Sequence, residues 1–379
     1  MKNARSLYLP GLNGIRAIAA LLVVISHISL QIADLGFAAR GSINMAGKGV
    51  TMFFVLSGYL ITTLLLKEQD KTGAISLRKF YVRRILRIWP IYYLALIIAI
   101  CWFLFSNQPI DGSGAFFYTF LMANVPFVFG GVISPVAQLW SVGVEEQFYL
   151  FWPWLFRWKQ RLPYLMLGII VLFLGLRLLL RVVENGNWYT FIGVTRFHCM
   201  AIGGLGAWAI HHKKAFVQKL YHPVLQVVCW LILAISVYKP LHFLSIIDNE
   251  LYAFLFLVII INVSTNPKTV LRLEHPIISW LGRISYGIYV YHLFAIIIGF
   301  ALYRRLLPAS PGYEIIVYIL VTGITLLMAH ISYYYFESWF LHRKEKFAVV
   351  PSTNVAQDLP RNDQSELKVS INTVGNNAD

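Results

Sequence analysis

Charge is scarce in this chain. Only 13% of its 379 residues are charged, about half the share found in ordinary soluble domains. Acidic residues are especially few, since 17 Asp and Glu stand against 32 Lys and Arg and leave a net charge of +15. Apolar residues make up 58% of the chain, and the mean hydropathy is +0.65. This composition excludes a disordered chain, a coiled coil and an ordinary cytosolic enzyme, and it predicts a protein surrounded by lipid.

Cysteine is also rare, and several familiar motifs are missing. Cys101, Cys199 and Cys229 each lie in an apolar run, without paired or metal-ligand spacing. This pattern excludes a disulfide scaffold, and we interpret the three thiols as small buried side chains. The sequence contains no P-loop, dinucleotide fingerprint, HExxH or GxSxG motif, so we expect no metal site. The basic residues are not gathered in a soluble module, which excludes a typical nucleic-acid partner.

Long apolar segments dominate what is present. Each is close to the length that a membrane-spanning helix needs, and the segment 114–133 also carries the helix-breaking residues Pro126, Gly130 and Gly131. If that segment does not cross, most basic residues between the spans fall on one side of the membrane. We therefore predict an all-α polytopic bundle of about ten spanning helices plus one re-entrant or broken segment, with both termini in the cytoplasm. The apolar segments are 13–33, 49–66, 88–105, 114–133, 139–156, 162–182, 196–212, 223–238, 251–264, 277–301 and 313–340.

The ends of the chain differ in character from the apolar part. We expect residues 1–342 to form one transmembrane domain and residues 343–379 to form a cytoplasmic, disordered tail, because the last residues are polar and poor in aromatics. The longest strongly basic stretch, 67–87, is interpreted as a loop before the third span. No internal repeat is visible, which disfavours a transporter built from inverted repeats.

The first span contains two ionisable residues, Arg16 and His27. A charge at the centre of a spanning helix costs about 2.5–3.5 kcal/mol, so such residues are candidates for function. Eleven residues separate them, which places both on one helix face about 16 Å apart along the axis. Arg16 is either an interfacial anchor or a ligand-binding residue. His27 either bonds a neighbouring helix or faces a cavity, where an imidazole can accept a proton near neutral pH.

Further polar residues recur around the later spans. Arg84 and Arg87, spaced i,i+3, either set topology or bind the phosphates of an anionic cytosolic ligand with their guanidinium forks. Glu145 and Glu146 lie 100° apart on their helix, so both face the bundle interior only with difficulty. His292 either makes a structural hydrogen bond or belongs to a site.

Five motifs in order resemble the membrane-bound acyltransferase family 3. They are R-x-x-A…H from Arg16 to His27, FF-x-x-SGY around Ser57, RR-x-x-RI-x-P-x-Y after Tyr81, WS-x-x-x-EEQFYL from Trp140, and G-x-x-SYGIY-x-x-H ending at His292. The match runs from about Leu9 to Phe340. The resemblance implies an integral membrane enzyme that moves an acyl group, most often acetyl, from cytosolic acyl-CoA to a hydroxyl of a carbohydrate acceptor. It also implies a multi-pass protein of the bacterial cytoplasmic membrane, in contact with lipid.

The resemblance assigns roles to individual residues. His27 is expected to act as general base on the acceptor hydroxyl, or to carry the acyl group transiently. Glu145, or its neighbour Glu146, is expected to support that imidazole. The donor phosphates are expected at Arg16, Arg84 and Arg87. Supporting or substrate-binding positions are Glu146, Ser57, Tyr149, Arg196, Tyr286 and His292.

Two other functions fit the same residues. A secondary transporter or exporter would also use intramembrane Glu and His, and a non-catalytic glycan receptor would also need a membrane anchor. The enzyme hypothesis alone requires that the arginine-lined inner mouth and the deeper imidazole belong to one tunnel. The sequence indicates neither the acceptor nor an oligomeric state.

Overall fold

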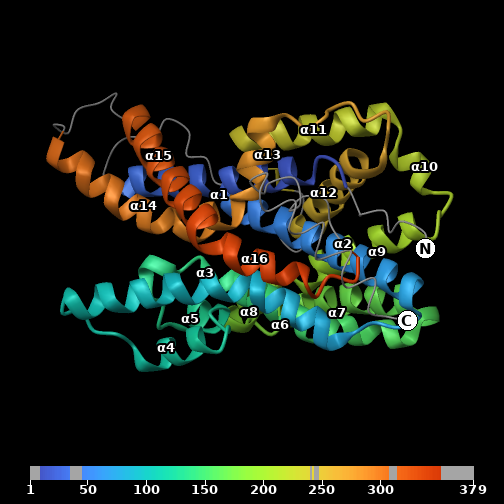
Figure 1. Ribbon diagram of the computed structural model, residues 1–379, viewed down its shortest axis with the longest axis horizontal. Helices are drawn as coiled ribbons and strands as arrows, with labels where there is room; N and C mark the ends of the chain where they lie inside the picture. The colour runs from blue at the N-terminus through green and yellow to red at the C-terminus, as the bar shows by residue number, and fades with distance from the viewer. Residues whose placement is uncertain (1–8, 35–44, 240, 243–246, 307–313, 351–379) are drawn as a thin grey trace.

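The computed structural model describes residues 9–34, 45–239, 241–242, 247–306 and 314–350, and these residues form helices and no strands. The predicted all-α class is therefore confirmed. The helices form an elongated bundle (Figure 1). In chain order they are α1 (Leu12–Asp34), α2 (Ala46–Thr72), α3 (Leu77–Phe105), α4 (Gly112–Thr119), α5 (Asn124–Phe129), the 3₁₀ turn η1 (Ser134–Val136), α6 (Leu139–Phe151), η2 (Trp152–Arg161), α7 (Leu162–Val182), α8 (Gly186–Thr195), α9 (Phe197–His211), α10 (Val217–Leu220), α11 (Pro223–Tyr238), α12 (Asp248–Thr265), α13 (Pro276–Arg283), α14 (Ser285–Leu306), α15 (Glu314–Ser332), the π turn η3 (Tyr333–Glu337) and α16 (Ser338–Glu345).

Seven helical stretches in the described part of the chain are long and apolar enough to cross a membrane. This confirms a multi-pass membrane protein. Helices such as α9 and α11 are apolar but shorter, at 15 and 16 residues, so the count of about ten spans stays a prediction. The seven stretches are Leu12–Ile32, Ala46–Thr72, Leu77–Phe105, Leu139–Val182, Asp248–Thr265, Ser285–Arg305 and Glu314–Glu345.

The segment 114–133 is broken, as predicted. Its helices are the short α4 and α5. Two glycines with positive φ angles follow α5, 103° at Gly130 and 93° at Gly131. Such angles favour glycine and stop a helix from continuing. Two later segments also change geometry, because α13 gives way to α14 around Ile284 and α15 passes through the π turn η3 before α16.

The stretch 67–87 is mostly helix, so its interpretation as a loop was wrong. α2 continues to Thr72, where Gly73 caps it with a φ of 75°. α3 begins at Leu77, after Ser76 accepts a hydrogen bond from the backbone N–H of Lys79. The apolar pattern marks only the apolar part of each helix, whereas the end of α2 and the start of α3 carry charged residues and continue the helices beyond it. Arg84 and Arg87 therefore lie on one face of α3, as the i,i+3 spacing predicts.

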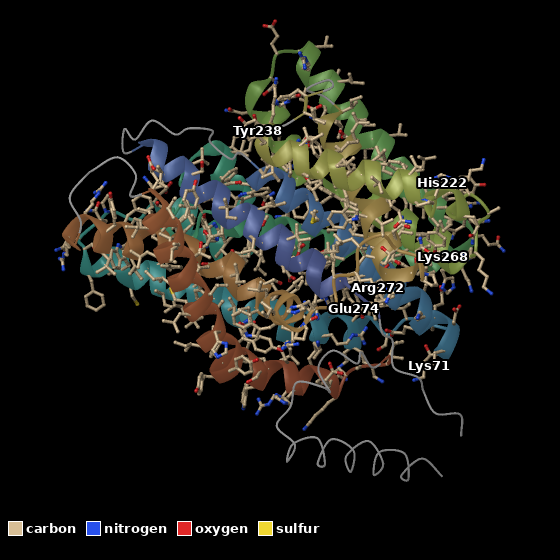
Figure 2. The ribbon with its side chains drawn as sticks, turned by 90° about the horizontal axis from the view of Figure 1, so that it is seen from above. Lys71, His222, Tyr238, Lys268, Arg272 and Glu274 are labelled. Carbon is tan, nitrogen blue, oxygen red and sulfur yellow. The ribbon has the colours of Figure 1, made fainter. Side chains whose placement is uncertain are left out.

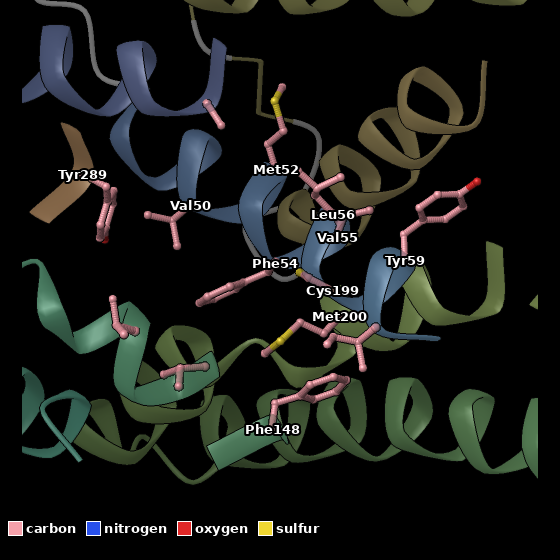
Figure 3. Close-up of a cluster of buried hydrophobic side chains, with 14 of the residues drawn as sticks. Val50, Met52, Phe54, Val55, Leu56, Tyr59, Phe148, Cys199, Met200 and Tyr289 are labelled. Atoms are coloured by element: carbon pink, nitrogen blue, oxygen red, sulfur yellow. The ribbon is translucent and has the colours of Figure 1, made fainter. Parts of the chain in front are cut away.

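The centre of the bundle depends on close packing between α2 and α9. Gly58 of α2 faces the backbone of Met200 so closely that a Cβ atom there would collide with the Met200 carbonyl oxygen. Small residues allow this approach between helices in a membrane. Figure 3 shows Phe54 and Val55 of α2 facing Cys199 and Met200 of α9. The packing fixes α2, which carries Ser57 toward the candidate site.

Basic connections gather at one end of the molecule. Lys71, from the end of α2, lies toward the same end as Lys268 and Arg272, which precede α13 (Figure 2). Tyr238, the last residue of α11, lies away from these three basic residues. This grouping agrees with the predicted basic side of the bundle. That this side faces the cytoplasm stays a prediction.

Candidate active site

A cavity of about 260 Å³ lies among α1, α2, α3, α6, α14 and α16. Its walls bring together residues from all five sequence motifs. Apolar side chains such as Phe53, Leu60 and Leu64 form part of the wall, and seven of the residues predicted from the sequence belong to its polar part. The predicted residues that line it are Arg16, Ser57, Arg84, Arg87, Glu145, Tyr149 and Tyr286.

Positive charge dominates one part of this lining. Arg16 donates to Asn13 Oδ1 at 2.8 Å, one helical turn away. The Arg84 guanidinium lies 5.7 Å from the ring centre of Tyr149, and its buried Nε has no hydrogen-bond partner in the described part of the chain. Arg83, in contrast, is paired with Glu68 at 2.9 Å. An arginine with a buried, unused donor at a cavity wall is suited to hold an anionic ligand.

The two adjacent glutamates accept hydrogen bonds from different helices. Glu145 accepts a hydrogen bond from Ser57 Oγ of α2 at 2.7 Å and a longer one from the Tyr149 hydroxyl at 3.4 Å. Glu146 accepts from Trp89 Nε1 of α3 at 2.8 Å. The 100° offset along α6 explains this division. Among the contacts of the described residues neither carboxylate meets His27, so a glutamate that supports His27 stays a prediction.

His27 of α1 instead contacts His292 of α14. The distance from His27 Nδ1 to His292 Nε2 is 3.2 Å, and the ring centres are 4.9 Å apart. His292 is fully buried, whereas His27 is partly exposed. Nothing in the sequence links these helices, because 265 residues separate the two side chains.

The contacts of the pair determine which nitrogens carry protons. His292 Nδ1 lies 2.6 Å from the Tyr289 carbonyl oxygen, and a carbonyl only accepts, so this nitrogen must carry a hydrogen. In a neutral ring, His292 Nε2 then has a lone pair and accepts from His27 Nδ1–H. The Val23 carbonyl oxygen, 3.0 Å from the same His27 nitrogen, requires the same tautomer. His27 Nε2 is thus left with its lone pair, as a base or nucleophile requires.

Tyr289 separates this pair from the cavity. Its side chain lines the cavity and its hydroxyl donates to the Gln138 carbonyl oxygen at 3.0 Å. Its ring packs edge-on against Phe53, with centres 5.8 Å apart, and lies equally far from the His292 ring. His27 and His292 are not lining residues. The predicted continuous tunnel is therefore interrupted in the structure, because the Tyr289 ring, packed on Phe53, contacts both the cavity and the His292 ring.

The remaining predicted residue, Arg196, lies elsewhere. Its Nη1 donates to the Gly47 carbonyl oxygen at 2.7 Å and to Thr51 Oγ1 at 2.9 Å, and its Nε donates to the Gly193 carbonyl oxygen. These bonds fasten the start of α2 to the end of α8. A role for Arg196 in binding substrate stays a prediction.

Sequence reasoning missed part of the cavity wall. Glu337 and Lys344, from η3 and α16, also line it, although residues from 343 onward were assigned to the tail. Their spacing of seven residues, with Leu341 between them, is the signal for one helix face directed at the cavity. The domain boundary at 342 stays a prediction, and residues 351–379 lie outside the described residues.

Within the described ranges, no group of three or more His, Cys, Asp or Glu is placed to hold a metal ion. The expectation of a metal-free site stays a prediction.

The chain is similar over most of its length to known acyltransferases. A family model described as an acyltransferase domain matches residues 9–334. The O-acetyltransferase OatA of Staphylococcus aureus is 31% identical over 362 residues, which cover 87% of this chain and 57% of that protein. The peptidoglycan O-acetyltransferase OatA of Listeria monocytogenes is 29% identical over 325 residues, which cover 75% of this chain and 49% of that protein.

The chain thus spans about half the length of these relatives. No solved structure matches it. Because the family model covers most of the chain, and because each of the five motifs contributes residues to one cavity, this protein is a member of the family of membrane acyltransferases that share this domain.

Proposed function

We propose that this protein transfers an acetyl group from cytosolic acetyl-CoA to a hydroxyl of a carbohydrate acceptor, with His27 as general base. The observation that carries the proposal is the contact between the His27 and His292 rings, whose inferred tautomer leaves His27 Nε2 unprotonated behind the Tyr289 ring that lines the cationic cavity. Family membership favours this enzyme over a transporter or a glycan receptor.

The donor matches the positive charge and the apolar wall of the cavity. Coenzyme A carries its phosphates at one end and its thioester at the other. Arg16, Arg84 and Arg87 would bind the phosphates, because guanidinium forks match phosphate oxygens. The apolar wall formed by residues such as Leu60 would receive the nearly neutral pantetheine arm. The thioester would then approach Tyr289, and a turn of the Tyr289 or Phe53 ring would admit it to His27.

The chemistry at His27 is acyl transfer. His27 Nε2 takes the proton from the acceptor hydroxyl as its oxygen attacks the thioester carbonyl carbon. The carbon–sulfur bond then breaks, and the coenzyme A thiolate leaves with the proton from the imidazolium. His292 Nε2 holds the ring by accepting from His27 Nδ1–H. The alternative, in which Nε2 itself carries the acetyl group transiently, uses the same lone pair.

The acceptor approaches from the side opposite the donor. His27 is partly exposed, which leaves room for a second substrate. The name of the Listeria relative specifies peptidoglycan, so peptidoglycan fragments are the first acceptor to test. A bacterial cytoplasmic membrane, with both chain ends in the cytoplasm, would place the donor cavity on the acetyl-CoA side.

The proposal is tested with purified full-length protein in lipid nanodiscs. Radiolabelled acetyl-CoA is supplied with peptidoglycan fragments, and base-labile acetate on the fragments and free thiol are both measured. His27→Ala should lower transfer by about 10²–10⁴-fold, the usual contribution of a general base. His330→Ala is the matched control, because His330 is another histidine of a spanning stretch that packs on aromatic rings and does not line the cavity. Transfer by His27→Ala at the wild-type rate would remove His27 from the chemistry.

A further inference from the structure

The C-terminal helix supplies one wall of the cationic cavity. Glu337, Leu341 and Lys344 all line the cavity, and their spacing of four and three residues places them on one face of the η3–α16 stretch. α16 packs directly on α3, the helix that carries Arg84 and Arg87. A phosphate held by those arginines would therefore also lie near α16.

Lys344 is an unusual residue on that wall. Only 7% of it is exposed, although lysine is almost never buried without a partner. Its nearest carboxylate in the structure is Glu345 Oε1, 3.5 Å away on the next residue. Arg84 and Arg87 line the same cavity as this amine, on the helix that packs against α16. A buried ammonium placed beside two guanidinium groups raises the local positive charge at a cost that a bound anion would offset.

The charge balance of the cavity lining favours an anionic ligand. The basic residues outnumber the carboxylates, and one of the carboxylates, Glu68, is already paired with Arg83. A second carboxylate, Glu145, is held by Ser57. Even with Arg283 left out of the count, five basic residues stand against four carboxylates in the lining. The basic lining residues are Arg16, Arg83, Arg84, Arg87, Arg283 and Lys344, and the acidic ones are Glu68, Glu145, Glu337 and Glu345.

Two basic residues hold the end of α16 in place. Arg83 Nη2 is paired with Glu68, while its Nη1 donates to the Phe347 carbonyl oxygen at 2.9 Å. Lys71 Nζ donates to the Val349 carbonyl oxygen at the same distance. Cations that bond the carbonyl groups at or beyond a helix C-terminus stabilise that end. Lys344 is therefore held at the cavity by contacts from α2 and α3.

We propose that Lys344 is a donor-binding residue, whose ammonium contacts a phosphate of acyl-CoA together with Arg84 and Arg87. This inference rests on the proposed function. It adds a binding residue that lies outside the family match, which ends at residue 334. The binding site then closes around the donor from α1, α3 and α16. Arg83 is a positioning residue, because it fixes the segment that carries Lys344.

The test measures the Kd of acetyl-CoA for full-length protein in nanodiscs, by equilibrium binding of the radiolabelled donor. Lys344→Gln should raise the Kd about tenfold, since one charged contact of about 1.4 kcal/mol is lost. Lys344→Arg should keep most of the affinity. Lys346→Gln is the matched control, because Lys346 is exposed, lies two residues away and does not line the cavity, and its Kd should equal that of the wild type.

A second probe separates phosphate binding from packing. Dephospho-CoA and inorganic pyrophosphate are used as competitors of radiolabelled acetyl-CoA. If Lys344 contacts the diphosphate, the inhibition constant of each competitor should be higher for Lys344→Gln than for wild type. If Lys344 contacts the 3′-phosphate instead, these two inhibition constants should not change. The ratio by which the protein prefers acetyl-CoA over dephospho-CoA should then be smaller for Lys344→Gln than for wild type. The thermal midpoint of the ligand-free variant reports whether packing was lost.

The outcomes distinguish this inference from the proposed function. A wild-type Kd for Lys344→Gln, while wild-type protein binds acetyl-CoA, would overturn the role of Lys344 and leave the proposed function standing. A lower affinity that Lys344→Arg fails to rescue, together with a lower thermal midpoint, would show that Lys344 acts only in packing. Wild-type protein that binds no acetyl-CoA would refute the proposed function and, with it, the inference.

Discussion

Two buried clusters of charge in this protein differ in what surrounds their cations. At the cavity, Arg84 makes no ion pair with the described residues, and the basic residues outnumber the carboxylates. In the second cluster, Glu250 lies 3.1 Å from Arg177 Nη1 and 3.1 Å from His198 Nε2. Cations bound to protein atoms indicate a structural role, whereas unused cations at a cavity indicate a ligand.

The second cluster also contains Arg196. Its Nη1 and Nε donate to the start of α2 and the end of α8, and no part of it lines the cavity. Arginine thus occurs in two different environments in one chain, and sequence spacing alone does not separate them. The following substitutions test this comparison.

The largest effect is expected on stability, from Glu250→Gln. Removing the carboxylate takes a counter-charge from buried Arg177, and breaking a buried ion pair costs about 3 kcal/mol or more. The thermal midpoint of the purified protein should fall, while the Kd of acetyl-CoA for the folded protein should stay at the wild-type value. A change in that Kd with an unchanged midpoint would place this cluster in the binding site instead.

A large effect on donor binding is expected from the double substitution Arg84→Lys and Arg87→Lys. Point charges replace bidentate forks, so the Kd of acetyl-CoA should rise about tenfold or more. Arg196→Lys makes the same chemical change in the second cluster and should leave this Kd unaltered. Equal affinity in the double variant and the wild type would mean that the two cavity arginines only set topology.

The smallest effect is expected from His292→Leu, which removes the acceptor for His27 Nδ1–H. The kcat should fall about tenfold, while the KM for acetyl-CoA should stay constant, because His292 positions His27 and does not line the donor cavity. His292→Gln should restore part of the kcat, since its amide oxygen can accept the same hydrogen bond. A higher KM with an unchanged kcat would instead assign His292 to substrate binding.

The sequence predicted the fold class and the broken segment well, because apolar length and helix-breaking residues are local signals. The convergence of Arg16, Arg84 and Glu145 on one cavity agrees with the family resemblance, although their roles stay predictions. Helix α3 was predicted to begin too late, since its first turns are amphipathic and lie outside the apolar run.

Other features could not be predicted, because they depend on contacts between distant helices. The bond between His27 and His292 joins α1 to α14. In the sequence, each histidine taken alone fits a structural hydrogen bond as well as it fits a place in a site. Lys344 lies in a basic stretch that resembles an ordinary topology signal. Only the π turn at Tyr333–Glu337 and the packing of α16 on α3 direct it to the cavity.

The most direct measurement is a cryo-EM structure of the full-length protein with acetonyl-CoA, an analogue whose thioester is replaced by an uncleavable thioether. The account predicts phosphates in ion-pair contact with Arg84 and Arg87, a displaced Tyr289 or Phe53 ring, and the analogue's carbonyl carbon about 3–3.5 Å from His27 Nε2 or from an acceptor oxygen bound to it. A ligand bound outside the cavity, or a carbonyl carbon held away from both imidazoles behind an unmoved Tyr289, would contradict it.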